Sequence, residues 1–278
     1  MHLHCKYSSE ANKRAPKQHL SSRLCFGSMK KYYSFLLISL LFNCRVGSTV
    51  PEDKIVFMET KTTVTGQIGE NLVLKCKVTS SPPATIHWLF KGQRIVQDST
   101  LTVLDDDAIY EEKKLSLAVT ESKLFIDCAD ETDAGSYTCV AQSPVKRKRL
   151  DFDVTLNGEV ADNYCTRLNK GKRISEMRHQ IPARVTMWSP NKMEEEHTDA
   201  HLFCRVSGFP KPTVTWYNRI NKKITENMSK YKLLRNGDLI IRNANFLDDM
   251  GSYKCIAKNS FSEDSQSTFL YPTVEKDK

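Results

Sequence analysis

The stretch Asp249-Met-Gly-Ser-Tyr-Lys-Cys255 decides the fold, together with Cys204 and Trp216 upstream of it. Cys204 and Cys255 can bridge two facing β-sheets, and Trp216, twelve residues after Cys204, can pack its indole against that bridge. Tyr253 stands two residues before the second cysteine, where a tyrosine hydroxyl ties the preceding turn back to the sheet. These residue types at these spacings predict a β-sandwich with a disulfide through its core.

The same constellation occurs a second time upstream. Cys76 is followed twelve residues later by Trp88, and then by Asp133-Ala-Gly-Ser-Tyr-Thr-Cys139. An internal repeat of this kind indicates two domains of one class. The spacing fits the immunoglobulin fold, so we predict an all-β chain of two tandem immunoglobulin-like (I-set) sandwiches joined by a short linker. The predicted core disulfides are Cys76–Cys139 and Cys204–Cys255, and the predicted core aromatics are Trp88, Tyr137, Trp216 and Tyr253.

Hydrophobic alternation sets the domain limits. Apolar side chains recur at every second residue over 72–78 and again over 150–156, which is typical of half-buried strands. Residues 157–182 are polar and irregular. We therefore predict a first domain at 50–156, a linker at 157–182 and a second domain at 183–278. The charged residues 91–122 are expected to be a solvated connection in the first domain.

The N-terminal part reads as a targeting segment. Residues 1–28 are polar and basic, which indicates a disordered extension or an artefact of the gene model. Residues 29–48 have the basic start, apolar centre and small-residue end of a signal peptide. The apolar run at 32–42 is too short to cross a bilayer; a membrane anchor of type II is the alternative. We expect a secreted, extracellular product without stable membrane insertion.

The cysteines support an oxidising compartment. The chain has 278 residues, nine cysteines and a formal net charge of +8. Cys5, Cys25 and Cys44 precede the expected mature chain, and the remaining six form an even set, typical of three disulfides in a secreted protein. Once the two core bridges are assigned, Cys128 and Cys165 remain. We predict that they pair and clamp the linker to the first domain; two free or intermolecular cysteines are the alternative.

Two surface motifs remain after the core is assigned. Lys146-Arg-Lys-Arg149 could bind a heparan-type polyanion or be cleaved as a dibasic site, although a solvated hairpin tip is the favoured interpretation. Asn227-Met-Ser229 is an N-glycosylation acceptor.

No catalytic constellation is found in the sequence, so we expect no enzyme, no cofactor and no metal site. His197 and His201 are four apart, but they flank a predicted strand, where four residues span about 13 Å. The net charge is too small for the strongly basic face of a nucleic-acid binder, so no nucleic acid is expected as a partner.

The second domain resembles one particular family. Leu234-Arg-Asn-Gly-Asp-Leu-Ile-Ile241, the extended run Asp249–Asn259 and the ending Thr268-Phe-Leu-Tyr-Pro272 are similar to secreted two-immunoglobulin proteins. These include the nematode "zwei Ig" neural proteins and an insect neural/ectodermal development factor that binds insulin-like peptides. The resemblance is closest over residues 199–273. Cys128 and Cys165 resemble cysteines of the nematode branch, and the insect branch lacks them. The long N-terminal extension departs from the family.

The resemblance implies two alternative functions. The first is an extracellular interaction protein that keeps axons and neurons in position in the nervous system. The second is a protein that sequesters insulin-like peptides and thereby antagonises insulin signalling, which would need an exposed apolar strip. Candidate positions for such a ligand surface are Met187, Trp188, Phe269 and Tyr271. Joint exposure of these side chains would favour the second function.

Overall fold

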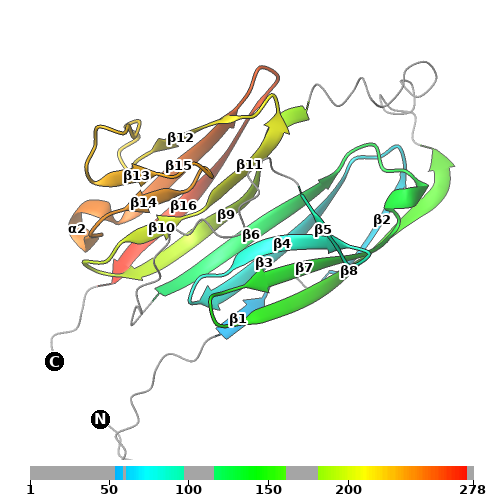
Figure 1. Ribbon diagram of the computed structural model, residues 1–278, viewed down its shortest axis with the longest axis horizontal. Helices are drawn as coiled ribbons and strands as arrows, with labels where there is room; N and C mark the ends of the chain where they lie inside the picture. Colours follow the sequence, from blue (N-terminus) through cyan, green and yellow to red (C-terminus); the bar gives the residue numbers. More distant parts are fainter. Residues whose placement is uncertain (1–53, 59–60, 97–115, 161–180, 274–278) are drawn as a thin grey trace, which may run out of the picture. The chain divides into compact units, whose positions relative to one another are not determined.

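The computed structural model describes residues 54–58, 61–96, 116–160 and 181–273 (Figure 1). The predicted extension, the predicted signal peptide and residues 161–180 of the predicted linker lie outside these residues. Within them the chain consists of β-strands, one short 3₁₀ helix and one short α-helix. This confirms the prediction of an all-β chain of two immunoglobulin-like sandwiches.

The first sandwich packs the strands β1, β3 and β6 against the five-stranded sheet β2-β8-β7-β4-β5. Strand β6 begins at Ser116, so the expectation of a solvated connection is wrong for residues 116–122. The bounds are β1 Lys54–Phe57, β2 Thr63–Ile68, β3 Leu72–Ser81, β4 Thr85–Phe90, β5 Gln93–Ile95, β6 Ser116–Ile126, η1 Glu131–Asp133, β7 Gly135–Gln142 and β8 Arg147–Val160.

The second sandwich packs β9, β16, β15 and β12 against the three-stranded sheet β10-β14-β13, and β11 pairs with β9. The predicted hairpin around Asn236-Gly237 is present as β13 and β14. The bounds are β9 Ile181–Glu195, β10 Ala200–Leu202, β11 Cys204–Phe209, β12 Thr213–Tyr217, β13 Tyr231–Leu233, β14 Leu239–Ile241, α2 Phe246–Asp249, β15 Gly251–Lys258 and β16 Glu263–Thr273.

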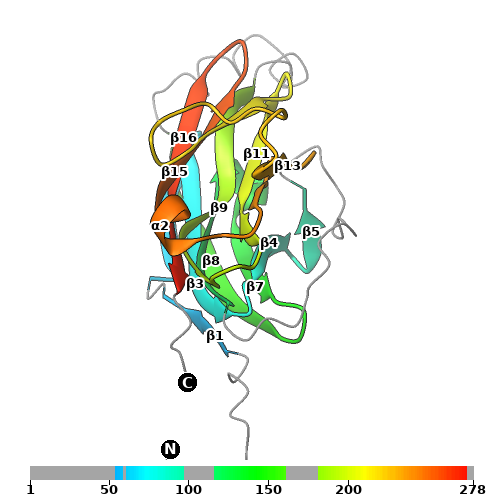
Figure 2. The same cartoon turned by 90° about the vertical axis from the view of Figure 1, so that its left-hand side faces the viewer.

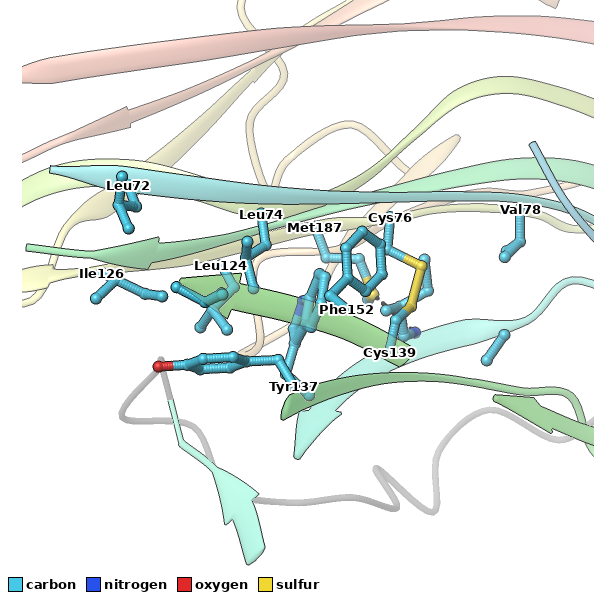
Figure 3. Packing of buried hydrophobic residues seen from close by; sticks show 14 of the residues in the cluster. Leu72, Leu74, Cys76, Val78, Leu124, Ile126, Tyr137, Cys139, Phe152 and Met187 are labelled. Carbon is cyan, nitrogen blue, oxygen red and sulfur yellow. Dashed lines mark hydrogen bonds between the residues drawn. A yellow bond between two sulfur atoms is a disulfide. The ribbon is translucent and has the colours of Figure 1, made fainter. Parts of the chain in front are cut away.

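The core of the first domain is built around the disulfide Cys76–Cys139, whose Cα atoms lie 6.5 Å apart (Figure 3). Trp88 is 2 % exposed, and its indole N–H donates to the Ser122 hydroxyl at 3.0 Å. The Tyr137 hydroxyl donates to the Asp133 carbonyl at 2.8 Å, which is the geometry of the tyrosine corner. Because the indole N–H and the tyrosine hydroxyl both have acceptors, the two aromatic side chains are buried without leaving these donors unpaired.

The core of the second domain repeats this arrangement around the disulfide Cys204–Cys255. The Trp216 indole N–H donates to the Gly237 carbonyl at 2.8 Å, and the Tyr253 hydroxyl donates to the Asp249 carbonyl at 3.1 Å. Gly237 has φ +97°, and a Cβ atom there would collide with the Cys204 carbonyl oxygen. Only glycine fits this turn, because the backbone of β11 passes directly against it.

A buried carboxylate, Asp238, fastens the β14 side of this domain to β11. It accepts hydrogen bonds from the Arg205 guanidinium at 2.7 and 3.0 Å, from the Cys204 amide at 3.0 Å and from the His201 ring at 3.0 Å. Burial alone would raise the pKa of Asp238, but Arg205 and His201 outweigh it and hold that pKa below its usual value. The carboxylate therefore stays charged and paired inside the domain.

The strand β9 links the two sandwiches into one sheet. Its first half pairs with β11, with two register shifts inside that pairing, and its last residues pair with β16. Along its other edge it pairs with β6 of the first domain, from Ser122 opposite Met187 to Ser116 opposite Glu194. Figure 1 shows β9 running beside β6. The result is an eight-stranded sheet that contains strands from both domains.

Candidate binding surface

The sheet that the two domains share determines which of the four predicted ligand-surface residues are exposed. Met187 is 6 % exposed and points into the core of the first domain, where its sulfur accepts the Ile86 amide N–H at 3.2 Å (Figure 3). Trp188 is 5 % exposed and packs in the core of the second domain, with the Lys123 ammonium 4.8 Å from its ring centre. The prediction that these two side chains belong to an exposed ligand surface is therefore wrong, because β6 covers the edge of β9.

Phe269 and Tyr271, the other two predicted residues, lie on the open side of the sheet. They are 43 % and 40 % exposed and stand two residues apart on β16. The Phe246 ring, from α2, meets the Tyr271 ring edge-on with centroids 5.6 Å apart. Figure 2 shows α2 beside β16. The next residue of α2, Leu247, is 81 % exposed.

The pairing of β6, β9 and β16 places further apolar side chains beside these two rings. One cross-strand row holds Val119, Asn191 and Phe269, and the adjacent row holds Leu117, Met193 and Tyr271. Ala118, Lys192 and Leu270, which lie between the rows, are buried on the opposite side. Alternate residues of a strand face opposite sides of the sheet. The outward side therefore carries an apolar strip, which we define as Leu117, Val119, Met193, Phe269 and Tyr271.

Sequence reasoning missed Leu117, Val119 and Met193. All three are partly exposed, and two of them belong to the first domain. Burial alternates along the whole of β6, but the sequence hides this alternation, because Ser116, Ala118 and Thr120 stand at buried positions. The alternation alone could not show that β6 would pair with β9, since that pairing joins segments of different domains.

A buried ion pair lies beneath the strip, on the inner side of the sheet. The Lys192 ammonium lies 2.9 Å from the Glu194 carboxylate and donates to the Ser116 hydroxyl at 2.8 Å. That hydroxyl in turn donates to Glu194 at 3.1 Å. The side chains of Lys192 and Glu194 are 2 % and 1 % exposed. Such charges are tolerated in the interior only when they are paired, so this cluster favours one register of β6 against β9.

A second polar contact fastens the domains near the other end of β6. The Arg184 guanidinium donates to both oxygens of Asp127, at 2.8 and 2.9 Å. The same guanidinium lies over the Phe125 ring, 4.5 Å from its centre. A two-point contact of this kind fixes orientation as well as distance. The strip is thus held on a sheet that is fastened at both ends of the domain junction.

The remaining predicted sites lie away from the strip. Asn227 is exposed in the turn between β12 and β13. Lys146, Arg147, Lys148 and Arg149 are exposed at the turn between β7 and β8 and at the start of β8. Cys128 is disulfide-bonded, but Cys165 lies outside the described residues, so their pairing stays a prediction.

The part of the chain that the structure describes contains no group of three or more metal-ligating side chains. The ring of His201, one of the two histidines four residues apart, bonds to Asp238 instead. Within the same ranges no helix is long and apolar enough to cross a membrane.

Comparisons with known proteins agree with this architecture. The immunoglobulin I-set domain family matches residues 185–271, and a second immunoglobulin domain family matches residues 52–143. The solved structure of the neural ectodermal development factor IMP-L2 covers 80 % of this chain and 96 % of its own, with a TM-score of 0.56 and 23 % identity, a likeness of fold.

Curated proteins match over most of their length. The Zwei Ig domain protein zig-4 of Caenorhabditis elegans is 32 % identical over 75 % of this chain and 76 % of its own sequence. Zwei Ig domain protein zig-3 of the same organism is 32 % identical over 74 % and 75 %. The neural/ectodermal development factor IMP-L2 of Drosophila melanogaster is 28 % identical over 75 % and 73 %. The chain therefore belongs to the family of the zwei Ig domain proteins.

Proposed function

We propose that the chain is a secreted binding protein that holds an extracellular protein ligand against the apolar strip and so helps to keep neurons and axons in position. The strip is the observation that carries this proposal. The protein would act by binding alone, without enzymatic chemistry. The resemblance to its relatives supports a role in the nervous system, and the apolar strip supports the binding of a protein ligand.

The strip has the properties of a protein-binding surface. Soluble proteins rarely leave neighbouring aromatic and aliphatic side chains exposed on a flat sheet unless a partner covers them. Aromatic side chains such as Phe269 and Tyr271 often dominate the binding energy of interfaces, because they bury a large area at a small cost in conformational entropy. The sheet fixes their spacing before the ligand arrives, which lowers the entropy lost on binding.

Secretion is supported by the chemistry of the described domains. The two core disulfides are of the kind that forms and persists in oxidising compartments. The acceptor Asn227 is exposed, as glycosylation requires. Residues 29–48 have the composition of a signal peptide.

A second candidate function is the sequestration of insulin-like peptides. The strip favours it, because an apolar surface on a rigid sheet can bury one face of a small helical peptide. The resemblance to the insect factor points to the same ligand class. Since Met187 and Trp188 are buried, this ligand would contact side chains of β6, β9 and β16 instead.

One binding experiment separates the two candidates. The full chain, expressed from Met29 and purified from the medium, is tested against a panel of neuronal ectodomains and against insulin-like peptides. We expect Phe269→Ala with Tyr271→Ala to weaken binding of the true ligand about tenfold or more, as the loss of central aromatic anchors does.

The matched control is Phe261→Ala, since Phe261 is 48 % exposed on the loop before β16 and lies outside the strip. Unchanged affinity for every ligand after removal of both strip aromatics would overturn the proposed surface. Binding of insulin-like peptides alone would select the second candidate.

A further inference from the structure

The outer side of the sheet β2-β8-β7-β4-β5 carries a group of arginines from two strands of the first domain. His87 on β4 stands opposite Val140 on β7, which stands opposite Arg149 on β8. Arg147 lies two residues before Arg149 and faces the same side. Arg94 on β5 pairs with Leu89, two residues after His87, and so also faces this side. We call Arg94, Arg147, Arg149 and His87 the basic face.

Among the residues that the structure describes, no carboxylate forms an ion pair with the arginines of this face. Arg94, Arg147 and Arg149 are exposed, and none of them forms an ion pair within the described ranges. Arg147 instead donates to the amide oxygen of Gln142 at 2.9 Å. Several other cations on the strands are paired with carboxylates: Lys77 with Glu121, Arg184 with Asp127, Arg205 with Asp238 and Lys258 with Glu263.

Acidic groups lie further along the same strands. Asp151 follows Arg149 on the outer side of β8, where its carboxylate accepts the Thr138 hydroxyl at 2.6 Å, and Asp153 comes two residues later. The outer side is therefore polarised along β8, with arginines near the β7–β8 turn and aspartates towards the other end. Lys146 and Lys148 add exposed positive charge at the arginine end.

Burial and the arginines of this face together lower the pKa of His87. Partial burial and then the charges of Arg94, Arg147 and Arg149 lower the pKa of His87 to about 4. Three arginines on two strands thus act on one point of the surface. An anion placed there would be attracted by all three and would raise the pKa of this ring.

Strand pairing argues against proteolysis as the role of the basic run. Residues 147–149 are hydrogen-bonded to β7, opposite Gln142, Ala141 and Val140. A protease binds its substrate as a free extended segment, so cleavage after Arg149 would require β8 to leave the sheet. The segment is held in place as a surface instead.

We propose that the basic face binds a sulfated glycosaminoglycan chain that runs across the strands from β8 to β5. Neighbouring strands lie about 4.8 Å apart, so the guanidinium groups span three strand intervals, about 14 Å, on one side of the sheet. A row of cations at fixed separation suits a polymer with repeated sulfate groups, and guanidinium binds such groups through two parallel hydrogen bonds. Sulfated chains are the polyanions that an extracellular protein meets, so this choice rests on the proposed secretion.

The test uses the full secreted chain and a size-defined heparin oligosaccharide. We expect binding whose logarithmic affinity falls linearly with the logarithm of salt concentration. The triple variant Arg94→Gln/Arg147→Gln/Arg149→Gln should weaken binding about tenfold or more at physiological salt. It should also reduce the salt slope by about 2 to 3, since each lost ion pair removes about one.

The matched control removes three exposed cations from the other sheet: Lys54→Gln/Lys75→Gln/Lys254→Gln. This control variant has the same net charge as the triple arginine variant. It should keep its affinity for heparin within about twofold, because charges farther than a Debye length, about 8 Å, from the bound chain are largely screened. Equal losses in the two triple variants would overturn the proposal, since they would show attraction by net charge alone.

The imidazole resonance of His87 provides an independent readout. Bound oligosaccharide should raise the pKa of His87 from about 4, whereas an unchanged pKa at saturation would place the ligand elsewhere and refute the basic face. Equal binding of a single-stranded oligonucleotide of the same charge would refute the preference for sulfate. The variant Phe269→Ala/Tyr271→Ala should bind heparin normally, so loss of the strip's ligand and loss of heparin can be told apart.

Discussion

At the scale of single residues, the cores of both domains contain the same residue types but differ in some of their contacts. Each has a disulfide, a buried tryptophan and a tyrosine corner, and the spacing of these residues in the sequence was enough to predict them. The partners of the tryptophans differ: Trp88 donates to a serine side chain, whereas Trp216 donates to a backbone carbonyl. The sequence could not show these partners, because they lie 34 and 21 residues away along the chain, respectively.

Trp216 should be one of the most sensitive positions of the second domain. It is 1 % exposed, so Trp216→Ala leaves a cavity and should lower the free energy of unfolding by about 3–5 kcal/mol in urea denaturation. Trp216→Phe keeps much of the volume but leaves the Gly237 carbonyl without its donor, at a cost of about 1–3 kcal/mol. Phe261→Ala, on an exposed loop, is the control. A loss below about 1 kcal/mol for Trp216→Ala would contradict the packing described here.

His87 predicts how stability depends on pH. Its pKa in the folded chain is about 4, below the value of 6.5 for a free histidine. The unfolded chain therefore binds the proton more readily, and folding stability should fall as the pH drops from about 6.5 to about 4. His87→Gln should remove this part of the fall, as measured by denaturant midpoints at each pH.

The control for this experiment is His197→Asn, because His197 is exposed on a turn and its φ of +65° suits asparagine. A pH profile of His87→Gln that follows the unsubstituted chain between pH 6.5 and 4 would refute the assignment. Asp238 acts in a separate window: its lowered pKa stabilises the fold at neutral pH, and that contribution is lost only as the pH falls below about 3.8.

At the scale of elements, β6 and β9 show that a local sequence pattern can predict a strand but not the strand it pairs with. The alternation of burial along β6 is typical of a strand, but a strand edge can pair with any other edge that reaches it. Ser116, Lys192 and Glu194 read in sequence as solvated polar residues, and only the pairing of β6 with β9 makes them a buried cluster. For the same reason Met187 and Trp188 appeared to be surface residues on a first strand.

The link between β6 and the segment after β8 should be covalent. Cys128, two residues beyond the end of β6, is disulfide-bonded and has φ +52°, and its amide donates to the Asn71 side chain at 2.8 Å. We predict that its partner is Cys165. Peptide mapping under non-reducing conditions should recover a Cys128–Cys165 peptide.

Free thiols at both positions, or a covalent dimer through either one, would contradict this pairing. Double substitution by serine should leave both core disulfides formed. It should lower stability by about 2–4 kcal/mol, the typical contribution of a disulfide.

At the scale of the whole molecule, the two domains behave as parts of one structure. Residues 50–278 form a single compact unit, and the strip draws side chains from both domains. A ligand bound across β6, β9 and β16 would therefore contact side chains of both domains. The basic face lies on the other sheet of the first domain, so a glycosaminoglycan and a protein ligand would occupy different surfaces of the same molecule.

Thermal unfolding should show whether the two domains unfold together. Met187 belongs to the second domain in sequence but packs in the core of the first, so the second domain contributes a core side chain to the first as well as a strand to the common sheet. We expect the unsubstituted chain to unfold in one cooperative transition, followed by calorimetry and by the fluorescence of its tryptophans. Met187→Asp buries an unpaired charge beside Ile86 and should separate the signal into two transitions, the first domain melting at the lower temperature.

The control for this last prediction is Met228→Asp, in the turn between β12 and β13, which should leave a single transition. Amide exchange adds a local readout: the Ile86 N–H, which donates to the Met187 sulfur, should lose protection in Met187→Asp while the amides of β15 keep theirs. Two transitions in the unsubstituted chain would show that the shared sheet does not couple the domains. An unchanged melting profile in Met187→Asp would show that this side chain does not carry the coupling.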